Sequence, residues 1–150
     1  MNIKGISDNV QALLNAMTDP DFVEVIPAPE SSSQSFTGYP SATHFYQSTD
    51  SSYATVTQNR RVIRYSVYIY LINNETEVEQ WTRMCNIVDK VIQMFDESVD
   101  LSSSVLGLTK ACDIMRPVPG EIGKFSLNKS SGLVGEINLF CEKDITFRNY

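Results

Sequence analysis

The chain has 150 residues, of which 42% are hydrophobic and 20% are charged, so its composition fits a globular domain with its own core and excludes wholesale disorder. Its formal net charge is −6 at pH 7, and no basic stripe follows the sequence. We therefore do not expect the protein to bind nucleic acid through a general positive field.

The cysteines and the apolar runs favour a cytosolic protein that is neither exported nor embedded in a membrane. Cys85, Cys112 and Cys141 are odd in number and widely spaced, and no C-x-x-C pair occurs, which favours reduced, mostly buried thiols over a disulfide framework or a zinc site. The start, Met1–Ile6, has no apolar run behind a basic cluster, so we expect no signal peptide. The longest apolar stretch, around Val67–Ile72, is too short to span a bilayer, so we expect no membrane partner.

The first predicted element is an amphipathic helix from Ile6 to Met17, because its apolar residues recur at three- and four-residue steps. Asp19-Pro20-Asp21 ends this helix. A short strand is predicted over Phe22–Ile26. After a serine-rich surface loop from Glu30 to Gly38, a second strand is predicted over Tyr39–Tyr46.

The clearest predicted strand runs from Arg61 to Ile72. One face would carry an unbroken apolar row: Ile63, Tyr65, Val67, Ile69 and Leu71. The other face would carry Val62, Arg64, Ser66, Tyr68 and Tyr70 and would be only partly wet. At ~3.3 Å per residue this strand would be roughly 35–40 Å long.

The main helix is predicted over Glu75–Glu97, with Thr76 or Asn74 as its N-cap and acidic residues in its first turn. Its apolar stripe should lie across the apolar face of the sheet. Trp81 and Phe95 are its largest candidate anchors, and truncating a buried anchor to alanine should cost about 3–5 kcal/mol.

Three more strands are predicted after a loop, over Gly107–Arg116, Ile122–Asn128 and Leu133–Glu142. Pro117–Gly120 and Asn128–Gly132 would be the joints, the second of them a hairpin turn. The short joints favour an α+β fold: an antiparallel or mixed β-sheet packed against a long helix and an N-terminal helix, all within one domain spanning residues 1–150.

Constellations that carry chemistry are missing from the sequence. His44 is the one histidine, the carboxylates are scattered, and no glycine-rich phosphate loop occurs. We therefore expect no catalytic, metal or cofactor-binding site, no cofactor and no enzymatic activity. A small ligand-binding α+β domain with His44 or Cys112 in a pocket remains an alternative, and the structural reading of His44 is a partly buried residue with one hydrogen bond.

Two features point to binding instead. The polar stretch Gln47–Asn59 is interpreted either as a loose hairpin, in which Tyr53–Thr57 could resume as a strand, or as a long binding loop between two strands. Long loops are uncommon in compact domains unless they bind something, which favours binding. Positive charge gathers in Asn59-Arg60-Arg61, with Arg64 three residues on. This cluster is either a docking patch for an acidic partner or a solvated strand end whose charges discourage edge pairing.

The middle of the chain resembles the tail terminators and related tail-completion proteins of tailed phages. The resemblance rests on Gly38-Tyr39-Pro40-Ser41-Ala42-Thr43, on the polar stretch ending in Thr57-Gln58-Asn59-Arg60, and on the strand Tyr65-Ser66-Val67-Tyr68-Ile69-Tyr70. The long helix after this strand, the N-terminal helix and the C-terminal hairpin also agree in outline.

The resemblance implies a structural virion protein, assembled in the host cytoplasm, that forms a ring, commonly a hexamer, on the end of a completed tail tube. Its partners would be further copies of itself, the tail tube protein and a head-completion or connector protein, with DNA only as passing cargo; an acidic channel would repel that DNA. A neck or head-completion adaptor is the alternative within phage assembly. The expected interface residues are Ser48, Thr49, Asp50, Ser51, Tyr53, Thr57, Asn59, Arg60, Arg61 and Arg64.

Overall fold

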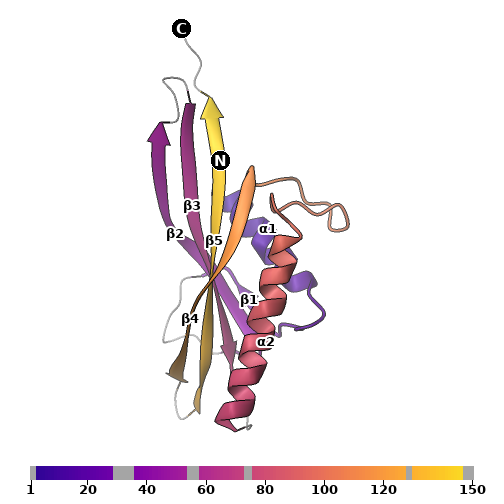
Figure 1. Cartoon of the computed structure of the whole chain (residues 1–150). Coiled ribbons are helices and arrows are strands. Elements are labelled where there is room, and N and C mark those ends of the chain that lie inside the picture. The colour runs from indigo at the N-terminus through magenta and orange to yellow at the C-terminus, as the bar shows by residue number, and fades with distance from the viewer. Residues whose placement is uncertain (1–2, 29–35, 54–57, 73–75, 128–129, 147–150) are drawn as a thin grey trace.

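The computed structural model describes residues 3–28, 36–53, 58–72, 76–127 and 130–146. Its strands form a single five-stranded sheet in the order β1-β2-β3-β5-β4 (Figure 1). The elements are α1 (Ile3–Ala16), β1 (Val25–Ile26), β2 (Ser41–Tyr53), β3 (Gln58–Leu71), α2 (Glu77–Asp96), β4 (Ile114–Leu127) and β5 (Ser130–Thr146). β1 pairs with β2 in parallel, and the other neighbours pair antiparallel, so the predicted α+β class with a mixed sheet is confirmed.

Both helices lie on the same face of the sheet (Figure 1). α1 contacts β1 and β2, whereas α2 contacts β3, β4 and β5. The predicted row on β3 is buried against them, from Ile63 to Leu71. On the other face of β3, Ser66 and Tyr70 are buried and Tyr68 is half-buried, which confirms that this face is only partly wet. One face of the sheet is therefore packed in the hydrophobic core, and the other face is partly exposed and partly apolar.

The start of α2 follows the predicted capping chemistry. The Thr76 hydroxyl accepts a hydrogen bond from the Glu79 backbone N–H at 3.3 Å, and the Glu79 carboxylate accepts one from the Thr76 N–H at 3.2 Å. This reciprocal pair satisfies two backbone donors that a helix start leaves unpaired. Thr76 is therefore the N-cap.

One of the two predicted anchors of α2 is wrong. Phe95 is fully buried, but Trp81 is 51% exposed. Met84, one turn after Trp81, is the fully buried residue, and it packs where Gly135 of β5 lets the helix come close: a Cβ at Gly135 would lie 3.0 Å from the Met84 sulfur. Val78, in the same part of α2, is also exposed, so the first turns of the helix bury little apolar surface against the sheet.

Of the two interpretations of Gln47–Asn59, the long loop is wrong and the hairpin is correct. β2 continues through Tyr53 and β3 begins at Gln58, so only residues 54–57 separate the strands, and these lie outside the described residues. A β-bulge between Tyr46 and Ser48 marks the change from core strand to polar strand. Cross-strand pairing with β3 overrides the turn preference of the serines, because strand preference depends on neighbouring strands.

The earlier strand is shorter than predicted: of Phe22–Ile26 only Val25 and Ile26 pair, and β2 begins at Ser41 rather than at Tyr39.

β4 differs from its prediction as well. The predicted strand from Gly107 begins only at Ile114, and Pro117–Gly120 is no joint, because β4 runs through it with a bulge between Pro119 and Ile122. Prolines are tolerated here because β4 is an edge strand. The β4–β5 hairpin itself is confirmed by the pairing of Leu127 with Ser130.

Candidate assembly interface

The strands β2, β3 and β5 extend past both helices at one end of the sheet (Figure 1). We call this three-stranded extension the arm and define it as Asp50–Tyr53, Gln58–Val62 and Glu142–Thr146, which pair with one another in register. No helix of the described chain covers it (Figure 1). The arm therefore offers surfaces on which a neighbouring chain can bind.

Two of the three arginines of this region form ion pairs with carboxylates of β5. Arg60 forms an ion pair with Asp144 at 3.2 Å. Arg64 forms one with Glu136 at 3.4 Å and donates a hydrogen bond to Asn138. Arg61 lies on the opposite face of β3 and forms no ion pair within the described residues. The predicted positive docking patch is thus reduced to Arg61, because the other two charges are met by carboxylates of the next strand.

The β2 edge of the sheet is open over most of its length. β1 pairs only with Ala42 and Thr43, and the Ala42 N–H donates to the Glu24 carbonyl at 2.9 Å. Backbone groups point to alternate sides along a strand, so His44 and Tyr46 also face this edge. After the bulge the alternation places Thr49, Ser51 and Tyr53 there. Among the residues that the structure describes, no strand pairs with β2 on this side beyond Thr43.

The opposite edge of the sheet, formed by β4, offers no free backbone N–H at its outward positions from Met115 to Pro119. By the same alternation Met115, Pro117 and Pro119 face outward on β4. The Met115 N–H donates to the Val99 carbonyl at 2.5 Å, and the two prolines have no N–H. Further along, the Asp144 N–H of β5 donates to the Asp113 carboxylate at 3.0 Å, a bond that holds the pKa of Asp113 below its usual range.

Beyond the β4 bulge, Ile122 and Lys124 face outward, and Lys124 places a charge on that edge. Lysine on an edge strand discourages pairing with a further strand. The two edges of the sheet are therefore unequal, and β2 is the edge suited to strand addition.

Most of the predicted interface residues gather at the arm and its base. Ser48, Thr49, Asp50 and Ser51 are exposed on β2, and Tyr53 ends this strand. On β3, Arg60 is exposed and Arg61 and Arg64 are half-buried.

The prediction of Asn59 as an interface residue is wrong, because its side chain is buried. Thr57 lies outside the described residues. Sequence reasoning missed Asp144 and Glu136, the partners of the arginines. The acidic residues that alternate along the last strand were the signal for them.

His44 lies deep between α1 and the sheet. Its Nε2 lies 2.5 Å from the Gln11 carbonyl oxygen, and its Nδ1 lies 2.6 Å from the Tyr65 hydroxyl. The Gln11 amide nitrogen donates to the Val25 carbonyl, so its oxygen faces His44; Nε2 then donates the proton and Nδ1 accepts from Tyr65. Burial lowers the pKa of His44 to about 4. His44 is a neutral core residue with two hydrogen bonds, one more than predicted.

The cysteines are free, as predicted: Cys112 and Cys141 are buried and Cys85 is half-buried. Contact with Cys112, together with burial, raises the pKa of Cys141, so this thiol stays protonated. Within the described ranges, no three His, Cys, Asp or Glu side chains lie close enough to hold a metal ion. No helix in the described part of the chain has the length and apolarity needed to cross a membrane.

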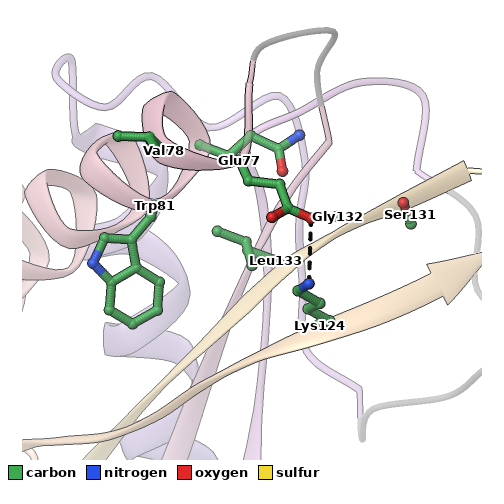
Figure 2. A pocket seen from close by; sticks show the side chains of 8 residues that line it. Glu77, Val78, Trp81, Lys124, Ser131, Gly132 and Leu133 are labelled. Carbon is green, nitrogen blue, oxygen red and sulfur yellow. Dashed lines mark hydrogen bonds and ion pairs between the residues drawn. The ribbon is translucent and has the colours of Figure 1, made fainter.

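A groove lies at the other end of the sheet, between the start of α2 and the β4–β5 hairpin. It has a volume of about 530 Å³ and includes Val78, Trp81 and Leu133 in its lining. Figure 2 shows the Trp81 indole beside it and the ion pair of Glu77 with Lys124, 3.3 Å long. The groove is open and holds no buried acid or base, so it has no features of a catalytic cleft.

No protein-family model and no curated protein matches the sequence. The features that bear on function are the arm, the unequal edges and the resemblance carried by residues 38–71.

Proposed function

We propose that the protein is a structural subunit of a phage tail that forms a ring on the tail tube, ends tube elongation and provides the joining surface for the head. The observation that carries this proposal is the arm, whose faces no helix of the described chain covers. A subunit that works alone has no use for strands that extend past its core. Exposed strands of this kind are a liability unless a partner covers them.

The ring has physical requirements that the arm is suited to meet. Each contact in a cyclic ring joins two different surfaces of the same subunit, so one part of the molecule must reach its neighbour. Arg61 and the polar residues Thr49 and Ser51 lie on the helix-side face of the strands, where a neighbour could contact them. Ion pairs such as Arg60–Asp144 keep the arm itself soluble.

The remaining partners follow from the same proposal. One side of the ring would bind the tail tube protein, and the other would bind the head-completion or connector protein. DNA would pass through the ring without adhering, because a subunit with a net charge of −6 is suited to a channel that repels phosphates.

The test is electron microscopy and native mass spectrometry of the purified protein mixed with tail tubes. We expect ring density on one end of each tube and a closed oligomer in the mass spectrum. The tubes belong in the test because a subunit can remain unassembled until it meets them. Bare tube ends at saturating protein would contradict the proposal.

The neck-adaptor alternative makes a different prediction for particles that lack the protein. Loss of a terminator should give overlong tails, whereas loss of a neck adaptor should give full heads without tails. The ligand-binding alternative has less support, because His44 and Cys112 are both buried in the core.

A further inference from the structure

The unequal edges of the sheet determine how two copies of this chain can join by strand pairing. A head-to-tail contact would place the β2 edge of one copy on the β4 edge of the next. In the half of the sheet beside the arm, that second edge has lost its donors: Met115 bonds to Val99, and Pro117 and Pro119 have none. Strand pairing between copies is therefore left to β2 with β2.

We propose that the free subunit forms a two-fold dimer in which β2 pairs antiparallel with β2 of a second copy. A surface that pairs with itself gives an isologous contact, which a two-fold axis requires. Each copy contributes outward backbone groups at Thr49 and Ser51, and both residues are exposed. The added strand would satisfy these groups and cover the long open edge of β2.

Charge selects the register of the pairing. Outward residues must face outward residues, so the axis can pass at Thr49, at Asp50 or at Ser51. An axis at Asp50 would place two like charges directly opposite each other, which is destabilising. An axis at Thr49 would place the outward Ser51 opposite Gln47, the bulge residue, which breaks the regular pairing. An axis at Ser51 places each Asp50 opposite Ser52 and pairs outward residues only, Thr49 with Tyr53 and Ser51 with Ser51, so charge and the bulge together select Ser51.

The dimer goes beyond the ring proposed above and does not depend on it. A cyclic ring contains no two-fold axis that relates neighbouring subunits side by side, so the dimer and the ring cannot share this contact. The dimer would instead protect the edge of the free subunit, and ring formation would release it.

Hydrogen exchange of the native protein at low and high concentration tests the proposal directly. We expect the Thr49 and Ser51 amides to become protected as the dimer mass appears in sedimentation. The amides of Ser48 and Asp50 face β3 and serve as internal controls, protected at both concentrations. A monomer at all concentrations would overturn the proposal, and so would a dimer whose Thr49 and Ser51 amides stay unprotected.

Matched variants separate the backbone from the side chain. Thr49→Pro removes the outward N–H, and we expect it to weaken the dimer by about tenfold or more, since two symmetry-related hydrogen bonds are lost. Thr49→Val keeps the N–H and the branched shape, and its dimer should stay within about threefold of the parent. Equal weakening by both variants would contradict pairing through the backbone.

Cross-linking locates the axis. Residues directly opposite in a hydrogen-bonded antiparallel pair have Cα atoms about 5.5 Å apart, a distance that a disulfide can bridge. In a Cys85→Ser background we expect Ser51→Cys to form a covalent dimer under mild oxidation, whereas Val118→Cys, on the β4 edge strand, should not. A covalent dimer from Val118→Cys with none from Ser51→Cys would refute the β2 pairing.

Discussion

The strands β2, β3 and β5 pass through two different environments. In the half that the helices cover, residues such as Tyr65, Ile137 and Leu139 are buried, and burial of apolar surface stabilises the fold. In the arm the same strands carry Arg60 and Asp144 and are held by strand pairing and exposed ion pairs. The difference separates two tasks: the covered half maintains the fold, and the arm is available to a partner.

The largest expected effect lies in the covered half. Phe95 is fully buried in the core, so Phe95→Ala should lower the free energy of unfolding by about 3–5 kcal/mol. Trp81→Ala is the matched control on the same helix, and we expect it to cost less than half as much, because the indole is 51% exposed. Urea unfolding measures both. Equal losses of unfolding free energy would contradict the expectation that the exposed Trp81 contributes less than the buried Phe95.

The second effect concerns His44, in the half of β2 that α1 covers. Its pKa is about 4 in the folded state and 6.5 in the unfolded chain, so between these values the unfolded state binds more protons. Stability should therefore fall as the pH drops from 6.5 to 4, by about 1.4 kcal/mol per unit where the difference is complete and by about 3 kcal/mol in all.

Denaturant unfolding across this pH range measures the effect, with His44→Gln as the control that cannot titrate. The control should have a flatter pH profile. A parent profile as flat as that of the control would contradict a neutral, buried His44.

The third effect sharpens the contrast between the edges. The double variant Pro117→Val, Pro119→Val restores two outward N–H groups on β4, so a chain with two open edges should form larger, concentration-dependent assemblies in sedimentation velocity. Its unfolding free energy should change by only about 1–2 kcal/mol, because the prolines act mainly on the unfolded state. Arg116→Val is the control: it adds apolar surface to the same strand, but its backbone faces β5. Assembly by the control alone would point to side chains rather than to the edge.

The smallest effect is in the arm. Arg60→Ala removes an exposed ion pair with Asp144 and should cost no more than about 1 kcal/mol of stability. A double-mutant cycle with Asp144→Ala, followed by thermal unfolding, isolates the pair. A loss as large as that of Phe95→Ala would mean that the arm belongs to the core.

The sequence by itself determined the parts of the protein whose environment repeats along one element. The alternation of β3 and the stripe of α2 from Met84 to Phe95 were correct, and Thr76 was one of the two predicted caps, because each is read from neighbours within one strand or helix.

Only the tertiary structure decided the rest. The serines of β2 became a strand because β3 lies beside them, and β4 runs through two prolines because it is an edge. Val99 and Asp113 close one side of the sheet from distant positions in the chain. Strand ends and sheet edges depend on which backbone lies alongside, and that information is not local.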